Sequence, residues 1–351
     1  MNFLKKHPFF IRLFHWEYWS FTAVYSWIYP VWFLFCLRAR SFFFFAAANP
    51  KIRNGGFLNE SKKELAPQIP ARYHPPTVFF SLPGNGDQVL SALRNAGMDF
   101  PLIGKPDIGG RGRGVKVLAD ETAVRNYVST ISLDFHIQEF VPFPLEAGIF
   151  YCRIPGEEKG RITGIVYKEF LKVTGDGKRT IGALLQSSTR AIMYYPALQR
   201  MHGARLDDIL PEGEQFTVSP YGNHARGSLF LDYSYMADAT MNETFDTICK
   251  EIPDFYFGRL DIRFASWEDL KEGKNMAIIE VNGAGSEPTH IYDPRHSLFF
   301  AWKEIIRHWH LLYRISRANH KSGVPYLTLS EGLAMFREDK EWSRRLAAIP
   351  E

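Results

Sequence analysis

A run of nineteen uncharged residues, Trp19 to Leu37, sets the first limit on how this chain can fold. The run is long enough to cross a lipid bilayer as a helix. However, Pro30 interrupts it, tryptophan and tyrosine recur along it, and basic residues flank it, which is typical of a segment at the water–lipid interface. Interfacial or re-entrant membrane contact therefore fits best, while a true span and a buried arm packed on a folded domain stay open.

The overall composition is that of a folded, enzyme-sized protein. The chain has 351 residues, 46% apolar and 23% charged, and its glycines and prolines follow no repeat, which excludes collagen-like, low-complexity and coiled-coil proteins. The formal charge of +4 is small and the charges are interspersed, so we expect no nucleic-acid partner. Three widely spaced cysteines encode neither a disulfide framework nor a zinc site, which favours a reducing cytosol.

Strand and helix patterns alternate beyond residue 76, which predicts an α+β fold. Residues 49–76 mix Gly, Pro, Asn and charges and indicate an irregular connector with one short helix. The last long helix, from residue 302 onward, has apolar residues at helical spacing. We expect its other face to meet solvent or lipid headgroups; that face carries Arg307, His308, His310, Arg314 and Arg317.

A glycine-rich loop follows a short predicted strand that ends at Lys105. Its glycines are Gly109, Gly110, Gly112 and Gly114. Residues without a Cβ let the backbone approach a ligand closely, so backbone N–H groups and the lysine ammonium could surround a polyphosphate. A flexible hairpin that is merely rich in glycine is the alternative, and the spacing matches neither a P-loop nor a dinucleotide-binding fingerprint.

Two later strands, GRLDIRF and MAIIEVN, carry polar residues at alternate positions. Arg259 and Asp261 share one face of the first strand, and Glu280 and Asn282 share one face of the second. The short connection predicts a hairpin in which the carboxylates converge. Two carboxylates and an amide oxygen suit Mg²⁺ when phosphate oxygens and water complete its octahedron. Paired surface charges on an edge strand are the alternative.

Taken in chain order, the lysine, the glycine loop, a hinge with glutamates, and the Arg-x-Asp and Glu-x-Asn strands resemble the ATP-grasp family. The D-alanine:D-alanine ligases and the glutathione and cyanophycin synthetases are the most similar members, and VTGDGKRTIGALL at 173–185 resembles a segment of the last two. The resemblance covers residues 77–300. It implies an ATP-grasp fold, in which two α+β subdomains clasp ATP.

On this resemblance we divide the chain into five parts. They are an aromatic, membrane-associated segment at 1–48, a reduced N-terminal region at 49–100, an ATP-grasp lid subdomain at 101–190, a core subdomain with the metal site at 191–300, and C-terminal amphipathic helices at 301–351.

The resemblance also implies roles in nucleotide binding. Lys105 and Lys168 would contact the phosphates, with Lys172 a rival for the second position, and the glycine loop would cover them. Adenine would bind at a hinge, and the ribose hydroxyls would bind a carboxylate that lies seven residues beyond the hinge glutamate. The hinge residues are Glu139, Phe140 and Val141, and the ribose carboxylate is Glu146.

The remaining implied roles concern the chemistry. Arg259, together with Lys168, would steady an acyl phosphate and the tetrahedral intermediate that follows it. Asp261, Glu280 and Asn282 would hold Mg²⁺, with Mn²⁺ as an alternative ion. The segment GAGSEPTHIYDP that follows Asn282 departs from the alanine ligases, so we expect a different acceptor pocket. The family's glutamate near the first substrate has no counterpart that the sequence reveals.

The implied function is an ATP- and Mg²⁺-dependent ligase that joins a small-molecule carboxylate to an amine through an acyl phosphate. An ATP-grasp phosphotransferase is the enzymatic alternative, and a nucleotide-binding membrane scaffold without turnover is the alternative from another class. The aromatic segment at 1–48 places the protein at the cytoplasmic, inner face of a membrane, as a peripheral or monotopic protein. The oligomeric state is left open.

Overall fold

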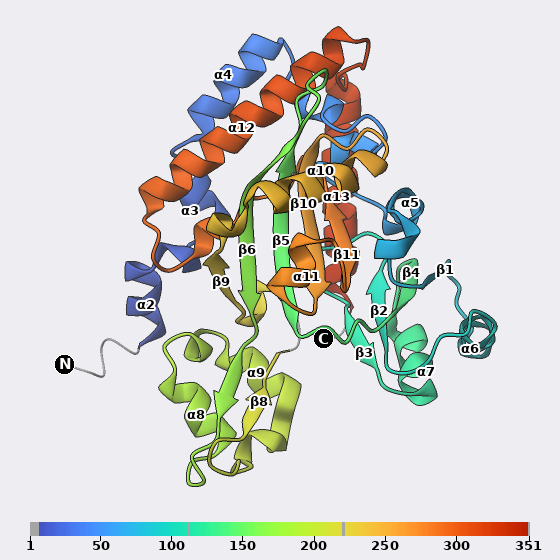
Figure 1. The fold of residues 1–351 in the computed structure, drawn as a ribbon. Coiled ribbons are helices and arrows are strands. Elements are labelled where there is room, and N and C mark those ends of the chain that lie inside the picture. Colours follow the sequence, from blue (N-terminus) through green and yellow to red (C-terminus); the bar gives the residue numbers. More distant parts are fainter. Residues whose placement is uncertain (1–6, 111, 220–221, 350–351) are drawn as a thin grey trace.

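A five-stranded antiparallel sheet forms the central layer of the computed structural model, which describes residues 7–110, 112–219 and 222–349 (Figure 1). Its strand order is β11–β10–β5–β6–β9. The strands are β5 (Leu145–Cys152), β6 (Arg161–Glu169), β9 (Leu229–Asp232), β10 (Phe257–Phe264) and β11 (Met276–Asn282).

Successive side chains of β5 point to opposite faces of this sheet, and each face is covered by other elements. Ile149 and Tyr151 belong to a core shared with helix α10 (Ala239–Glu251), and the short helix α11 (Trp267–Lys271) lies beside it. Phe150 and Cys152 belong to a second core, which is built from α12 (Leu298–Lys321) and the N-terminal segment.

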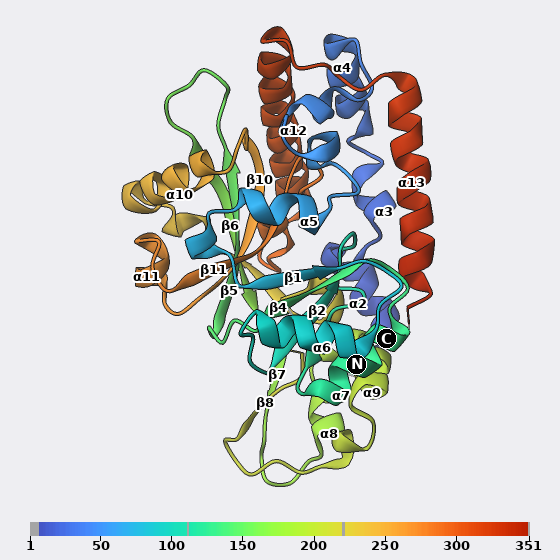
Figure 2. The same ribbon diagram turned by 90° about the vertical axis from the view of Figure 1, so that its right-hand side faces the viewer.

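A second, four-stranded sheet lies beside the first and has the order β1–β4–β2–β3 (Figure 2). Its strands are β1 (Thr77–Phe80), β2 (Leu102–Pro106), β3 (Lys116–Leu118) and β4 (Phe135–Glu139). Helices α6 (Gly86–Asn95) and α7 (Glu121–Thr130) cover one face and bury Leu90 and Val124 against it. Asn85 and Asp120 cap the two helices by accepting hydrogen bonds from their first-turn N–H groups.

A small third unit extends below the sheets in Figure 1. It pairs β7 (Lys172–Thr174) with β8 (Gln215–Thr217) and packs them on α8 (Ile181–Ser187) and α9 (Tyr195–His202). Leu185, Leu198 and Val218 are buried in a core of its own.

The predicted α+β class is confirmed, but the sheets do not follow the predicted division of the chain. Strand β1 and helix α6, assigned to the region 49–100, share a sheet with β2–β4. Strands β5 and β6, assigned to the subdomain 101–190, pair with β10 and β9 of the region 191–300. Sheet membership depends on hydrogen bonds between distant segments, and the order of elements along the chain does not reveal it.

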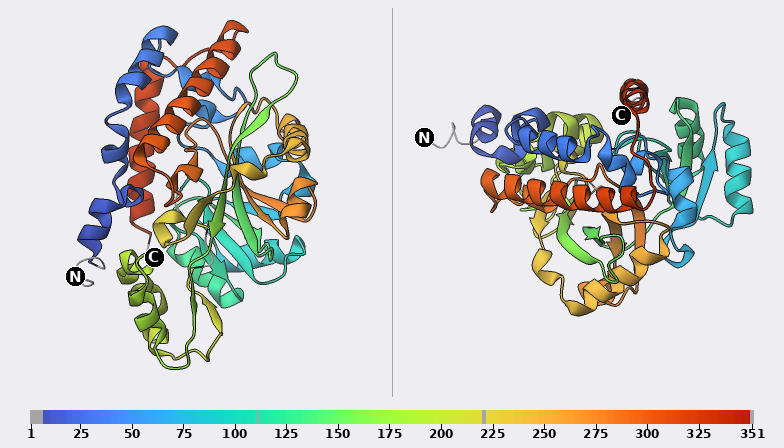
Figure 3. Two further views of the ribbon diagram at one scale, coloured as in Figure 1. Left: turned by 60° about the vertical axis from the view of Figure 1, so that its left-hand side comes forward. Right: turned by 90° about the horizontal axis from the view of Figure 1, so that it is seen from above.

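The N-terminal segment folds into short helices, and its later part packs on α12 (Figure 3). The helices are α2 (Pro8–Phe14), α3 (Phe21–Tyr25) and α4 (Tyr29–Ala39), with a 3₁₀ turn η1 at Trp16–Tyr18. Phe44 and Phe45, in the 3₁₀ turn η2 (Phe44–Ala47), are fully buried. Within the described ranges, no helix is both long and apolar enough to cross a bilayer.

Helix α12 is enclosed on two sides, which corrects the expectation for His308, while His310, Arg314 and Arg317 on the same predicted face are exposed. Its Ala301 and Ile305 pack on the N-terminal segment, whereas His308 is buried on the sheet side. The His308 ring lies 3.0 Å from the Thr163 hydroxyl of β6 through Nε2, and 2.8 Å from the Glu304 carbonyl oxygen through Nδ1. The N-terminal segment therefore covers the apolar side of α12, and the sheet covers the side that carries His308.

The predicted connector at 49–76 is more ordered than expected. It contains helix α5 (Lys62–Leu65), capped by Ser61, and the 3₁₀ turns η3 (Arg53–Gly56), η4 (Ala66–Gln68) and η5 (Ala71–Tyr73). A final helix, α13 (Leu329–Ala347), begins with a capping box at Thr328 and crosses from this connector to the four-stranded sheet. Figure 2 shows α13 standing apart from α3 and α4.

Candidate functional site

A cavity of about 1500 Å³ lies between the two sheets and extends towards the N-terminal segment and α13. Nearly all residues that the sequence singled out line it. These are Lys105, Gly109, Gly110, Gly112, Glu139, Phe140, Val141, Glu146, Lys168, Arg259, Asp261, Glu280 and Asn282. Gly114 is the exception, and its turn packs on Pro106 instead. Lys172 lies on the exposed strand β7, away from the cavity, so only Lys168 of the two rival lysines faces it.

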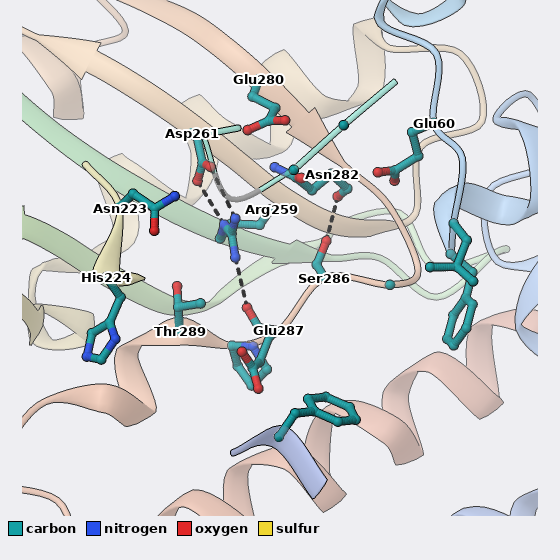
Figure 4. Close-up of a pocket in the computed structure, with 18 of the residues that line it drawn as sticks. Glu60, Asn223, His224, Arg259, Asp261, Glu280, Asn282, Ser286, Glu287 and Thr289 are labelled. Carbon is teal, nitrogen blue, oxygen red and sulfur yellow. Dashed lines mark hydrogen bonds and ion pairs between the residues drawn. The ribbon is translucent and has the colours of Figure 1, made fainter. Parts of the chain in front are cut away.

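Strands β10 and β11 place the polar side chains of the cavity floor opposite one another, as Figure 4 shows. The predicted hairpin is confirmed: Arg259 pairs with Asn282, and Asp261 pairs with Glu280. The register shifts directly after Asp261, and Arg259, Asp261 and Arg263 of β10 all line the cavity. The convergence of the carboxylates therefore follows from strand register.

A buried ion-pair network surrounds Asp261. Arg259 donates through Nε to Asp261 Oδ1 at 2.8 Å, and Lys168 Nζ lies 3.2 Å from Oδ2. Burial alone would raise the pKa of the Asp261 carboxyl, but these two cations outweigh it and lower that pKa. Asp261 is thus ionised at neutral pH and holds two cations at fixed positions, facing the cavity.

Glu146 is the second carboxylate in this network. Its Oε1 accepts from Lys168 Nζ at 3.0 Å, and its Oε2 lies 3.1 Å from Arg263 Nε. Burial would lower the pKa of Lys168, yet Asp261 and Glu146 together raise it. Lys168 is therefore a permanent cation held between two carboxylates.

The glycine loop and Lys105 form the opposite wall. Lys105 donates to Gln138 Oε1 at 2.7 Å, and burial lowers the pKa of its ammonium to about 8. Gly112 has a positive φ of 70°, a backbone conformation that favours glycine, and its carbonyl oxygen accepts from Arg226 at 2.7 Å. Arg226 therefore anchors the loop on the side of the cavity that carries Lys105.

The residues predicted to form the hinge lie where β4 leaves the four-stranded sheet. Phe140 and Val141 line the cavity together with Ile103 of β2 and Val117 of β3, and so form an apolar slot. The N–H of Glu139 donates to the Pro76 carbonyl at 2.9 Å. A slot of this kind suits a flat aromatic ring.

Glu60 and Lys62 are among the charged residues of the cavity that sequence analysis missed. Glu60 accepts from the Gly283 N–H at 2.6 Å, and burial, with the nearby Glu280, raises the pKa of its carboxyl to about 7. Lys62 Nζ lies 3.6 Å from Glu280 and donates to the Gly109 carbonyl at 3.1 Å. Both come from the predicted connector, where the sequence signals only a capped turn of helix.

The loop after Asn282, whose sequence departs from the alanine ligases, is held by backbone pairing with the connector. The N–H of Ala284 donates to the Gly55 carbonyl at 3.0 Å, and that of Gly285 donates to the Gly56 carbonyl at 2.7 Å. Farther along, the Glu287 carboxylate accepts from Tyr25 of the N-terminal segment. The N-terminal segment therefore forms one wall of the cavity.

Asp261 of β10 and Glu280 and Asn282 of β11 could hold a divalent cation such as Mg²⁺ only if a ligand or water supplied further oxygen atoms. No group of three or more His, Cys, Asp or Glu side chains close enough to hold a metal occurs in the described part of the chain. The buried Nδ2 atom of Asn282 has no hydrogen-bond partner among the described residues. Mg²⁺ bound beside phosphates needs only one or two carboxylates, which Asp261 and Glu280 provide.

Comparison with known proteins gives structural similarity alone. No protein-family model and no curated protein matches the sequence. Solved structures that are similar include a bifunctional glutathione synthetase from Pasteurella multocida, at 11% identity and a TM-score of 0.36, over 70% of this chain and 35% of that chain. A D-alanine–D-alanine ligase from Bacillus anthracis matches at 12% identity and a TM-score of 0.39, over 75% and 69%.

A third similar structure is a carboxyaminoimidazole ribonucleotide synthase from Aspergillus clavatus in complex with ATP, at 7% identity and a TM-score of 0.38. It is matched over 65% of this chain and 45% of that chain, so the chain spans less than half the length of this synthase and of the glutathione synthetase. Two of these three structures are ligases of the kinds that the sequence resembles. At TM-scores below 0.5 they carry no weight for function, which has to come from the geometry of the site.

Proposed function

We propose that the protein is an ATP-dependent ligase that activates a carboxylate as an acyl phosphate and joins it to an amine. The observation that carries this proposal is the facing register of Arg259 with Asn282 and of Asp261 with Glu280, in one cavity with two buried lysines and a glycine loop. Such fixed cations and backbone N–H groups stabilise the charge that develops during phosphoryl transfer.

Each side chain of the network has a role in this proposal. Lys105 and Lys168 bind phosphate oxygens, and the hinge slot at Phe140 and Val141 binds the base. Arg259 holds the oxyanion that forms at the carbonyl, because its guanidinium is fixed by two hydrogen bonds to Asp261. Glu280, Asp261 and Asn282 would hold Mg²⁺, which neutralises negative charge on the phosphate oxygens when it is bound.

The reaction balances in two steps. A substrate carboxylate oxygen attacks the γ-phosphorus of ATP, the bond from this phosphorus to the bridging oxygen breaks, and ADP leaves. The amine nitrogen then attacks the carbonyl carbon of the acyl phosphate, inorganic phosphate leaves, and the nitrogen loses a proton. One carboxylate oxygen therefore ends in the released phosphate.

That oxygen gives the test. The protein is incubated with ATP, Mg²⁺, pooled amines and ¹⁸O-labelled carboxylic acids, and ADP release and ¹⁸O in phosphate are measured. We expect release that needs both an acid and an amine, transfers the label, and falls about 100-fold or more in Glu280→Gln. Glu272→Gln, an exposed residue paired with Lys274, is the matched control and should leave release unchanged.

Two other outcomes would replace the proposal. Release of ADP with a phosphorylated acceptor and no labelled phosphate would identify a phosphotransferase. Tight ATP binding without release from any pool would identify a nucleotide-binding scaffold.

We also propose that the N-terminal segment lies on the inner face of a membrane. The support is a set of large apolar side chains that point outward from its helices and turns: Phe14, Trp27 and Leu37 are 77%, 74% and 73% exposed. Exposed aromatic and aliphatic side chains of this kind suit the interfacial region of a bilayer.

Vesicle co-sedimentation tests this contact. We expect the protein to pellet with phosphatidylglycerol-containing vesicles, and the double variant Trp27→Asp/Leu37→Asp to remain in the supernatant. Tyr235→Asp is the matched control, because Tyr235 is also 74% exposed but lies outside the N-terminal segment. Equal pelleting of all three proteins would contradict the proposal.

A further inference from the structure

The cavity continues beyond its polar floor along a wall of aromatic rings. Phe57 lies against the loop that follows Asn282, where a Cβ on Gly285 would sit 2.2 Å from its carbonyl oxygen. The Phe57 ring stacks on Phe45 with centroids 3.8 Å apart and lies 6.3 Å from Trp32. The loop at residues 283–294, which we call the reaction loop, therefore connects directly to an apolar surface.

The wall extends from there to α13. The Phe45 and Phe43 rings are 6.0 Å apart, and the Phe43 and Phe336 rings are 6.1 Å apart. Gly332 of α13 packs on Phe43 so closely that a Cβ there would sit 2.3 Å from the ring. The contact fixes α13 beside the N-terminal segment, and Figure 3 shows both on the same side of the molecule.

Helix α13 turns apolar side chains towards the cavity next to this contact. Leu329, Leu333 and Phe336 recur at intervals of four and three residues, so they share one side of the helix. All three line the cavity, yet they are 62%, 49% and 45% exposed. Phe33 of α4 lines the cavity as well and is 52% exposed. Large apolar side chains thus border the same open space from both helices.

We propose that this space, the acyl groove, holds the aliphatic chain of a substrate, whose acid or amine head reacts beside Arg259. The inference rests on the proposed ligase function and adds the class of substrate, a long-chain amphiphile. The cavity supports it in two ways: one continuous volume of about 1500 Å³ exceeds what small polar ligands need, and its walls change from ion pairs to aromatic rings along its length. An aliphatic chain would remove half-exposed apolar side chains from water.

Neither a bilayer nor a second protein molecule explains the groove as well as the aliphatic part of a substrate does. A flat lipid surface would meet the outward side chains of α2 to α4, but the groove residues line a cavity that reaches the reaction loop. The groove is continuous with the charged floor, so an occupant needs a polar head and an apolar chain in one molecule.

Calorimetric titration of the full-length protein, with ADP and Mg²⁺ present, tests the inference. Dodecanoate and dodecylamine are compared with butyrate and butylamine, below their micelle-forming concentrations. We expect one saturable site for a twelve-carbon probe, with binding roughly tenfold or more tighter than for its four-carbon homologue. Leu333→Asp and Phe336→Asp should each weaken it by a similar factor, because both introduce a charge into the groove.

Phe299→Asp serves as the matched control, since Phe299 is 76% exposed and does not line the cavity. Leu333→Gln provides a second, milder variant if an aspartate variant fails to fold. Equal affinity for long and short probes, or unchanged binding in both groove variants, would overturn the inference.

The two proposals fail separately. ADP release from short acids and amines, without chain binding, would leave the ligase and remove the acyl groove. Saturable chain binding that depends on Leu333, without ADP release from any substrate, would leave the groove and remove the ligase.

Discussion

Lys168 is a buried cation that pairs with two carboxylates. Lys172, the rival for the second phosphate contact, lies on the exposed strand β7. Lys168→Met leaves Glu146 and Asp261 without this partner, so we expect a loss of about 3 kcal/mol in the free energy of unfolding. ADP formation should fall about 100-fold or more. Lys172→Met, on the exposed strand β7, should change stability by less than about 0.5 kcal/mol. Urea unfolding and ADP release measure both quantities, and a larger effect of Lys172→Met would reverse the assignment.

Site residues could be predicted from the sequence where several of them lie on one strand or on two strands joined by a short connection. The alternation of Arg259 and Asp261 places both on one face, and the short connection to Glu280 keeps the partner strand near. Glu60 and Lys62 gave no such signal. They reach the cavity because residues 55 and 56 pair with residues 284 and 285, and a contact across more than two hundred residues leaves no local pattern.

For helices and strands, too, contacts between neighbouring segments could be predicted from the sequence, whereas contacts between distant segments could not. The hairpin of β10 and β11 is local, and its register follows from the pattern of polar residues. The pairing of β5 with β10 joins segments far apart in the chain, so the central sheet takes strands from both sides of the predicted boundary at residue 190. On the predicted polar face of α12, His310, Arg314 and Arg317 are exposed as expected, but His308 is buried, because the helix packs on the sheet as well as on the N-terminal segment.

Gly332 tests how closely α13 packs on the N-terminal segment. A glycine-to-alanine change inside an exposed helix normally stabilises a protein by up to about 1 kcal/mol. We expect the opposite sign for Gly332→Ala, a loss of about 1–3 kcal/mol, because the new methyl group would overlap the buried Phe43 ring. Ala334→Ser on the exposed side of the helix is the control. Denaturant unfolding decides the sign, and stabilisation by Gly332→Ala would contradict the packing.

Helix α12 carries a prediction about pH. Burial lowers the pKa of His308 to about 3, helped by Arg307 and His290 and opposed by Glu304. The unfolded chain takes up this proton near pH 6.5, whereas the folded chain does not, so stability is full above about pH 6.5 and falls as the pH drops. Between pH 6.5 and 4.5 the slope should approach about 1.4 kcal/mol per pH unit from this group.

His308→Gln should remove that slope, at the cost of lower stability at pH 7 through its altered hydrogen bonds to Thr163 and Glu304. His310→Gln, an exposed neighbour on the same helix, should leave the slope as it is. The measurement is urea unfolding at several pH values. A wild-type slope that survives in His308→Gln would assign the pH dependence to other groups.

At the scale of the whole molecule, the N-terminal segment both completes the core and borders the site. Phe44 and Phe45 are buried against α12, and Tyr25 reaches the Glu287 carboxylate at the cavity. Asn49, directly after the segment, is fully buried and accepts from the Tyr256 and Phe257 N–H groups at 2.9 and 3.0 Å. The segment is therefore part of the fold.

Two deletions test whether the N-terminal segment, residues 1–48, is needed for folding or serves only as a membrane anchor. Among residues 7–14, which the structure describes, Ile11 is the buried side chain, so removal of residues 1–14 should lower the free energy of unfolding by about 3 kcal/mol or less. Removal of residues 1–48 also takes away Phe35 and Phe43–Phe45 from the core beside α12. At about 1.5–3 kcal/mol for each buried side chain, this loss is comparable with the whole net stability of a domain. We expect cooperative urea unfolding of the shorter deletion and none of the longer one. Cooperative unfolding of both would mean that the segment serves the membrane alone.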